Sequence, residues 1–102
     1  MRCYMIIICV IHDRAAFMAG YAPAAAALVA RFGGRYVLRA PGGAWLEGGF
    51  GAAPSVVVSE WPDRAAAMAF WTSPEYAEVK ALRNGVAEAQ VVVIDGELAG
   101  AA

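Results

Sequence analysis

An internal repeat constrains the fold of this 102-residue chain more than any other feature. The segment Asp13–Ala19 (DRAAFMA) recurs fifty positions later as Asp63–Ala69 (DRAAAMA). Each copy follows an apolar, β-branched run, Ile6–Cys9 in the first case and Val56–Ser59 in the second. A β-branched run indicates a strand, and an Asp before an Ala-rich stretch indicates a capped helix. The repeat therefore predicts two strand–helix units that are built alike.

The length and composition indicate one domain with more apolar surface than a soluble monomer usually carries. A chain of 102 residues has room for one core, and 61% of its residues are hydrophobic while 17% are charged. The net charge is -1 and the basic residues are scattered, which argues against nucleic acid or an anionic membrane surface as a partner. The longest apolar run, Tyr4–Ile11, is much shorter than the roughly 20 residues that span a bilayer. We therefore expect neither nucleic acid nor membrane as a partner.

The two cysteines indicate a reducing environment. Cys3 and Cys9 lie on the same predicted strand, which separates their backbones by about 20 Å. A disulfide requires Cα atoms within about 7 Å, so the two residues cannot pair with each other. We expect two free thiols, which are typical of the cytoplasm.

Further signals divide the chain into four strands and three helices. Pro23 lies inside the first helix, so we expect a kink or restart near Tyr21, and Gly33–Gly34 ends that helix. Ser73 and Pro74 suit the first positions of the third helix. The predicted elements are strand Cys3–Ile11, a helix capped by Asp13 and reaching Phe32, strand Arg35–Ala40, a Gly-rich connection Pro41–Pro54, strand Ser55–Trp61, a helix capped by Asp63 and reaching Trp71, helix Pro74 to about Asn84, and strand Ala89–Asp95.

The order of these elements predicts an α+β, ferredoxin-like βαββαβ fold with one additional helix before the last strand. Two right-handed crossovers within one four-stranded antiparallel sheet place the helices on one face. We expect a single domain over residues 1–96 and a flexible C-terminal tail over residues 97–102, which are mostly small.

Both faces of the predicted sheet are apolar. In the last strand Val91 and Val93 lie on one side while Val92 and Ile94 lie on the other, and the first strand is apolar on both sides as well. A face in contact with water would alternate with polar residues. Burial of ten or so such side chains, at roughly 1.5 to 3 kcal/mol each, is a large driving force. We expect a homodimer that packs sheet against sheet, and the alternative is a monomer whose long connection covers the second face.

A series of short motifs occurs along most of the chain: Gly33-Gly34-Arg35-Tyr36, Arg39, Leu46-Glu47-Gly48, Glu60-Trp61-Pro62, Phe70-Trp71-Thr72-Ser73-Pro74-Glu75-Tyr76, and Arg83. In this order and spacing, between about Tyr4 and Asp95, the motifs resemble domain-of-unknown-function family 1330 of the dimeric α/β-barrel superfamily. The resemblance implies a homodimer with facing sheets and outer helices. It implies no settled reaction, because the wider superfamily includes cofactor-independent monooxygenases, isomerases, and haem-binding or haem-degrading enzymes.

The chain departs from the family pattern at three points. Phe32 stands where members often carry His, and Ser55 stands where they often carry Arg. One additional residue lies between Asp13 and Tyr21. If the two absent polar groups serve a shared activity, that activity is altered or lost in this chain.

Glu60 is the first candidate catalytic residue because it interrupts an apolar strand, on the face that also carries Val56 and Val58. Desolvation at such a position would raise the pKa of the carboxyl toward neutrality and suit it to proton abstraction. The alternative is a structural ion pair with an arginine such as Arg39 on a neighbouring strand.

Arg39 and His12 are the other two catalytic candidates. The guanidinium of Arg39 suits a substrate carboxylate or an enolate oxygen, and the alternative is a surface or inter-subunit salt bridge. Arg35 is predicted to lie on the same face, so neither arginine is unique there. His12 is the only histidine and is a candidate base or proton shuttle, or else a solvated residue at a strand end. No Cys, His or carboxylate lies at ligand spacing from it, so we expect no metal and no haem.

Four residues are candidates for substrate binding. Tyr76 and Arg83 lie seven positions apart on the third helix and so project from one face, where they would line the mouth of a pocket. Tyr21 and Trp71 would contribute to an apolar wall between the helices and the sheet. The alternative for all four is ordinary core or interface packing.

These features together predict a small homodimeric cytoplasmic protein that binds a small organic acid or an aromatic metabolite in an apolar pocket, without a tightly bound cofactor. As an enzyme it would transfer a proton, in an isomerase or a monooxygenase, with Glu60 or His12 as the base. Arg39 or Arg83 would then stabilise the developing oxyanion. The alternative is a non-catalytic structural or ligand-binding dimer.

Overall fold

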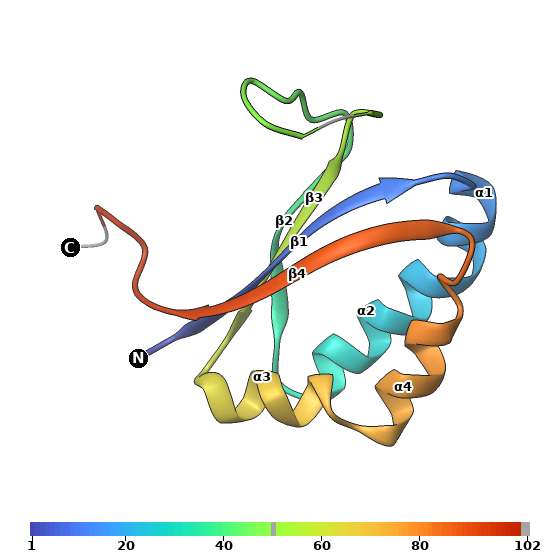
Figure 1. Ribbon diagram of the computed structural model, residues 1–102. Helices are drawn as coiled ribbons and strands as arrows, with labels where there is room; N and C mark the ends of the chain where they lie inside the picture. Colours follow the sequence, from blue (N-terminus) through green and yellow to red (C-terminus); the bar gives the residue numbers. More distant parts are fainter. Residues whose placement is uncertain (50, 101–102) are drawn as a thin grey trace.

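A computed structural model describes residues 1–49 and 51–100 and shows one antiparallel sheet with all of its helices on one face (Figure 1). The elements are β1 Cys3–Ile11, α1 Arg14–Ala16, the π-helix η1 Phe17–Tyr21, α2 Ala22–Arg31, β2 Arg35–Ala40, β3 Ser55–Trp61, α3 Arg64–Trp71, α4 Pro74–Ala81 and β4 Ala87–Asp95. The strands lie in the order β2-β3-β1-β4. This is the predicted ferredoxin-like α+β fold, in which each crossover skips one strand.

Both copies of the repeat begin with the predicted helix cap. The carboxylate of Asp13 accepts a hydrogen bond from the amide of Ala16 at 3.0 Å, and the carboxylate of Asp63 accepts one from the amide of Ala66 at 2.8 Å. Each bond satisfies one of the amides that a first helical turn leaves without a partner. The repeat seen in the sequence is therefore a repeat in the structure.

The first helix is broken near Tyr21, as predicted, and the break is a π-turn. The amide of Ala22 bonds to the carbonyl of Phe17, five residues back, over η1. Such a turn takes up one more residue than α-helical winding, which agrees with the additional residue noted before Tyr21. Pro23, which has no N–H to donate, lies in the first turn of α2, where this group is not needed.

The connection from α2 to β2 requires both of its glycines. Gly33 has a φ of +91°, which side chains disfavour, and so provides the left-handed exit from the helix. A Cβ atom on Gly34 would lie 2.8 Å from the indole of Trp61. The pair therefore ends the helix and lets the chain pass against the core.

Two predicted boundaries near the C-terminus were wrong by a few residues. The third helix ends at Ala81 rather than Asn84, because the amides of Leu82, Arg83 and Asn84 each bond three residues back and tighten the winding. The last strand begins at Ala87 rather than Ala89. It starts earlier because β1 continues to Ile11 and offers Ala87 a partner there.

The core lies between one half of the sheet and helices α2, α3 and α4. Its buried members are Cys3, Met5, Leu28, Val29, Trp61, Ala67, Phe70 and Tyr76. The rings pack closely, with centroids 5.1 Å apart for Trp61 and Phe70 and 4.5 Å apart for Phe70 and Tyr76. Cys3 and Cys9 are both free and buried, as predicted.

The face of the sheet that points away from the helices, called the open face below, is apolar along its middle and over the second half of β4. The strand register gives it the apolar residues Tyr4, Ile6, Ile8, Val10, Leu38, Val56, Val58, Val92 and Ile94, and the polar residues Arg35, Glu60, Glu88 and Gln90. Val92 and Ile94 are 55% and 52% exposed in the single chain. The predicted second apolar face is therefore present.

Outside the helices and strands, residues 41–49 and 51–54 belong to the long connection between β2 and β3. The amide of Gly43 bonds to the carbonyl of Pro54 at 2.8 Å and closes the base of this connection. Of the predicted C-terminal tail, residues 101–102 lie outside the described residues.

Candidate ligand-binding pocket

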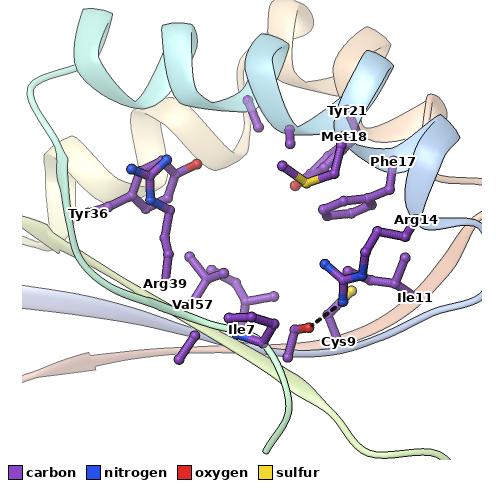
Figure 2. Close-up of a pocket in the computed structure, with 15 residues that line it drawn as sticks. Ile7, Cys9, Ile11, Arg14, Phe17, Met18, Tyr21, Tyr36, Arg39 and Val57 are labelled. Atoms are coloured by element: carbon purple, nitrogen blue, oxygen red, sulfur yellow. Dashed lines mark hydrogen bonds between the residues drawn. The ribbon is translucent and has the colours of Figure 1, made fainter.

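A cavity of about 300 Å³ lies between the sheet and the first helical segment (Figure 2). Its walls come from β1, α1, η1, the start of α2, β2 and β3. The lining residues are Ile7, Cys9, Ile11, Arg14, Phe17, Met18, Tyr21, Ala22, Ala25, Tyr36, Arg39, Ala40, Pro41, Ser55 and Val57. Most of these side chains are apolar, and the polar groups are two arginines, two tyrosines, one serine and one thiol. This is the composition of a small-molecule site.

The π-turn shapes the helical wall of the cavity. Phe17, Met18 and Tyr21 all belong to η1 and all line the space, with the rings of Phe17 and Tyr21 centred 5.2 Å apart. The extra residue of a π-turn changes the angle at which the side chains before and after it leave the helix axis. In Figure 2 these three side chains form one wall opposite Ile7 and Val57 of the sheet.

A β-bulge in β2 directs Arg39 into the cavity. Arg35 pairs with Glu60 across the β2–β3 ladder, but after the bulge at Val37 it is Arg39 that pairs with Val57. The bulge shifts the register by one residue, which moves the following side chains to the other face. The prediction that Arg35 and Arg39 share a face was wrong for this reason: Arg35 lies on the open face and Arg39 on the helical face.

Arg14 enters the cavity from the start of the first helix. Its Nη2 donates a hydrogen bond to Oγ of Ser55 at 3.2 Å, and Ser55 opens β3 on the opposite wall. The resemblance to the family implied an Arg at position 55, where this chain has Ser. The guanidinium beside Ser55 comes from Arg14, on a different element.

The four predicted substrate-binding residues lie close together, but three of them do not line the cavity. The hydroxyls of Tyr21 and Tyr76 share a hydrogen bond of 2.7 Å, the rings of Trp71 and Tyr76 are 5.2 Å apart, and the guanidinium of Arg83 lies 5.4 Å from the ring centre of Tyr21. Only Tyr21 lines the main cavity. Trp71 and Tyr76 line a second void of about 20 Å³ behind it, while Arg83 is buried against Tyr21.

Burial keeps the titratable groups of the cavity in their neutral forms. Burial raises the pKa of the Cys9 thiol, although the charges of Arg83 and Arg14 oppose that shift. Burial, followed by the neighbouring Tyr76, also raises the pKa of Tyr21 far above its usual value. Burial raises the pKa of Tyr36 in the same way, against the charge of Arg39. At neutral pH the lining is therefore positive, with hydroxyl and thiol groups that carry no charge.

Glu60 lies outside the cavity, on the open face. Its carboxylate accepts hydrogen bonds from Tyr4 Oη at 3.0 Å and from Arg35 Nε at 2.9 Å, and Arg2 Nη1 lies 3.7 Å away. These donors stabilise the ionised form, and the hydrogen bond from Tyr4 is the largest cause of a lowered pKa. This geometry is the ion pair considered as the alternative for Glu60, with Arg35 in the place suggested for Arg39.

His12 also lies outside the cavity. It is exposed at the end of β1, and its Nε2 is 3.2 Å from a carboxylate oxygen of Glu88, which is itself exposed. Of the three predicted catalytic residues, the structure therefore places only Arg39 at the cavity.

The described residues show no feature of a metal site or a membrane span. Within residues 1–49 and 51–100 no group of three or more His, Cys, Asp or Glu side chains is arranged to hold a metal ion. None of the helices in that part of the chain is long and apolar enough to cross a bilayer.

The fold and the cavity together define a ferredoxin-like α+β protein with a pocket between its sheet and its helices. The chain belongs to the family "Domain of unknown function (DUF1330)", whose pattern matches residues 2–97. The resemblance drawn from the short motifs is thereby confirmed. No curated protein was found to match the chain.

Solved structures share the fold at low sequence identity. RPA0582, a protein of unknown function from Rhodopseudomonas palustris, superimposes with a TM-score of 0.76 at 18% identity, over 95% of this chain and 83% of that one. SnoaB, a cofactor-independent oxygenase from Streptomyces nogalater, gives 0.71 at 15% identity, over 99% and 98%. An antibiotic biosynthesis monooxygenase gives 0.54 at 18% identity, over 94% and 99%. At these identities the likeness concerns the fold alone.

Several residues that line the cavity were not predicted from the sequence. Arg14 was interpreted only as part of a helix start, although it follows Asp13 in the same way that Arg64 follows Asp63. Phe17 offered a signal, because it is the one bulky residue at which the two copies of the repeat differ. The placement of Arg39 depends on the bulge, for which the sequence of β2 carries no Gly or other marker.

Proposed function

We propose that this protein binds a small, mainly apolar molecule in the cavity between β1 and η1, with one site in each subunit of a homodimer. The observation that supports this proposal is the cavity itself. Its volume of about 300 Å³ is at the lower end of the range for ligand sites, and a few polar groups converge on a largely apolar lining.

A cofactor-independent conversion of the ligand, by proton transfer or oxygenation, is the activity that the comparisons support. SnoaB is described as a cofactor-independent oxygenase, and a second neighbour as a monooxygenase. In this chain Arg39 and Arg14 would stabilise negative charge that develops on a substrate oxygen. Neither Glu60 nor His12 takes part in this proposal, since both lie outside the cavity.

A non-catalytic ligand-binding dimer is the second candidate, and one observation favours it. Within the part of the chain that the structure describes, the cavity lining contains no carboxylate and no imidazole, the side chains that most often serve as a base. The neutral tyrosines and thiol of the lining are weak bases. An enzyme built on this pocket would need a substrate with a readily lost proton.

The homodimer is proposed on the basis of the open face. Val92, Ile94 and Leu38 are between 46% and 55% exposed, and they continue an apolar surface over the middle of the sheet. Burial of apolar surface of this kind favours association of two chains. We also propose a cytoplasmic location, which the two free cysteines support.

Ligand binding is tested by a screen of organic acids and aromatic metabolites for thermal stabilisation. A ligand at 100 times its dissociation constant adds about 2.7 kcal/mol to the free energy of unfolding. Ala22→Phe should fill the cavity and abolish the stabilisation, whereas the control Ala27→Phe, on the exposed side of α2, should retain it. If a ligand stabilises both variants to the same extent, it binds outside the cavity.

Catalysis is tested on any ligand found in that screen. Loss of the compound and consumption of oxygen, measured without added cofactor, support the enzyme. A ligand that stabilises the protein and is recovered unchanged supports the binding protein.

The dimer is tested by light scattering at micromolar concentration. The wild-type protein should give twice the 10.7 kDa mass of one chain, and Val92→Lys on the open face should reduce it to one chain. Leu82→Lys, at a residue of similar exposure beyond α4, should leave the dimer intact. A wild-type particle of 10.7 kDa would rule out the dimer.

A further inference from the structure

The arginines of this protein fall into two groups according to their partners. Four of them lie within 4.0 Å of a carboxylate, in the pairs Arg2–Glu60, Arg31–Glu75, Arg35–Glu60 and Arg64–Asp95. Three others, Arg14, Arg39 and Arg83, form no ion pair with any carboxylate in residues 1–49 and 51–100. The division follows position, because all three arginines of the second group are at or behind the cavity.

Each of these three arginines contacts a neutral group instead. Arg14 donates to Ser55, Arg39 lies 5.1 Å from the ring centre of Tyr36, and Arg83 lies over Tyr21. Ser55, Tyr36 and Tyr21 all line the cavity. The 15 lining residues include no Asp and no Glu, so no acidic side chain faces this positive charge across the cavity.

An arginine keeps its charge under all ordinary conditions, so a positive apolar cavity favours an anion. Charged hydrogen bonds are roughly twice as strong as neutral ones, and they strengthen where water is excluded. Ser55 accepts its bond from Arg14 and so retains its own O–H for donation. The cavity therefore offers several hydrogen-bond donors to an anionic ligand. No carboxylate among its 15 lining residues competes with the ligand for these donors.

The two arginines that line the cavity approach it from opposite sides. Figure 2 shows Arg14 reaching in from α1 and Arg39 from β2, with Ile7 and Val57 forming the floor between them. Phe17 and Met18 cover this floor from the helical side. The charged groups are thus at the edges, and the apolar surface is in the middle.

We propose that the ligand of this cavity is an apolar carboxylate, such as an aromatic acid, whose carboxylate binds Arg14 at one edge of the cavity while its ring lies against Ile7 and Phe17. The positive charge of Arg39 at the opposite edge adds to the preference for an anion. This inference rests on the proposed function and narrows it to one class of ligand. Ser55 donates a further hydrogen bond to the carboxylate. A doubly charged inorganic anion does not suit the site, because it offers no surface to the apolar walls.

The experiment uses pairs of ligands that differ only in charge. Benzoate, 2-naphthoate and 9-anthracenecarboxylate are titrated into the intact protein at pH 7 by calorimetry, together with their primary amides and with inorganic phosphate. The carboxylate that fits best should bind at least tenfold more tightly than its amide, and phosphate should not bind. Arg14→Gln should weaken binding of the carboxylate about tenfold, Arg39→Gln should weaken it less, and both should leave binding of the amide unchanged.

Two further variants control for indirect effects. Arg31→Gln removes an exposed arginine of α2 that pairs with Glu75 away from the cavity, and it should change neither affinity. Arg39→Lys keeps the charge and should retain most of the preference for the acid. Both arginines that line the cavity are exposed overall, so these variants should fold, which an unfolding curve checks.

The outcomes separate this inference from the function on which it rests. If acid and amide bind equally and the arginine variants change nothing, the anion preference is wrong while ligand binding in the cavity stands. If phosphate binds as tightly as the acids, the apolar part of the inference is wrong. If none of the six organic compounds binds at millimolar concentration, both the inference and the proposed pocket are overturned.

Discussion

The first copy of the repeat, β1 with α1, η1 and α2, and the second copy, β3 with α3, begin in the same way. In each, a strand is followed by an Asp that caps the first helical turn, with bonds of 3.0 and 2.8 Å. In each, an arginine follows that Asp. Beyond this point the two structures diverge, although six of the seven residues of the repeat, Asp13–Ala19 and Asp63–Ala69, are identical.

The divergence begins at the position of Phe17 in the first copy and Ala67 in the second. Ala67 is fully buried, which lets α3 lie close against the sheet and the core. Phe17 is bulkier, belongs to a π-turn and lines the cavity. The same repeat position is therefore a core residue in one copy and a cavity wall in the other.

The two arginines show the same divergence. Arg64 donates from Nε to Asp95 at 3.0 Å and so links α3 to the end of β4. Arg14 has Ser55 as its partner and faces the cavity. One strand–helix unit thus stabilises the fold while the other lines a site. The differences are the bulky Phe17, the extra residue of the π-turn, and the lack of an acidic partner for Arg14 within residues 1–49 and 51–100.

The largest effect on folding should come from deleting one residue of α3, and a matching deletion in η1 is the comparison. Removal of Ala65 rotates the rest of α3 by about 100° and displaces Ala67 and Phe70 from the core. The variant should lose its folded core and show no cooperative unfolding transition. Removal of Ala19 should be tolerated, because it converts the π-turn to regular α-helix, although it should abolish ligand binding. Far-UV circular dichroism and thermal unfolding measure both, and equal damage from the two deletions would contradict the comparison.

A pair of Phe→Ala substitutions should separate the core from the cavity wall. Phe70 is 3% exposed and packs on Trp61 and Tyr76, so Phe70→Ala should lower the free energy of unfolding by about 3–5 kcal/mol. Phe17→Ala should cost clearly less, because one side of its ring faces the cavity. Denaturant titrations at equal protein concentration give both values, and a Phe17 variant as damaging as the Phe70 variant would mean that the first copy is also core.

The ion pair at Glu60 belongs to the second copy only, since Val10 occupies the matching position in the first. The pKa of Glu60 is lowered from its ordinary 4.5, first by the hydrogen bond from Tyr4 and then by Arg35. The ionised form is therefore favoured in the folded protein. This contribution to stability is fully present above about pH 4.5 and is lost as the pH falls through the lower pKa of the folded state.

Stability measured from pH 7 to pH 3 tests the role of this group. Glu60→Gln should be less stable than the wild type at pH 7, and the difference should shrink below pH 4.5 as the wild-type carboxylate takes up its proton. The cavity affinity should not change, because Glu60 lies on the other face. A difference in stability that stays constant over the whole range would exclude the ion pair as its cause.

Asp13→Ala and Asp63→Ala should have similar effects, because the two caps have the same geometry. Each should lower the free energy of unfolding by about 1 kcal/mol. Asp→Asn at either position, which keeps an accepting oxygen, should restore most of the loss. A first cap that costs nothing to remove would show that η1 and α2 form without it.

Sequence alone predicted most of the fold because its signals are local. The β-branched runs, the two Asp caps and the Gly33–Gly34 exit each act within a few residues, and the structure has all of them. The π-turn was only half predicted: Pro23 indicated a break near Tyr21, but its type depends on which carbonyl each amide reaches.

The site was harder to predict because it depends on contacts between distant segments. Arg14 and Ser55 are 41 positions apart and meet only through the packing of α1 on the sheet. Arg39 reaches the cavity through the bulge, without which it would lie on the open face with Arg35. Glu60 is buried, but the prediction that desolvation raises its pKa was wrong, because hydrogen bonds from Tyr4 and Arg35 lower it, and its face of the sheet is not the face of the cavity.

Arg14→Gln and Arg64→Gln should have the smallest effects on stability and the clearest contrast in function. Arg64 forms a partly exposed ion pair with Asp95, so its loss should cost between 0 and about 1 kcal/mol of unfolding free energy. Loss of Arg14, which has no acidic partner among residues 1–49 and 51–100, should cost no more than that. Affinity for an aromatic acid should fall about tenfold in the Arg14 variant and stay unchanged in the Arg64 variant. Titration of both variants with the same acid decides the matter, because equal affinities would show that the two copies of the repeat do not divide structure from binding in this way.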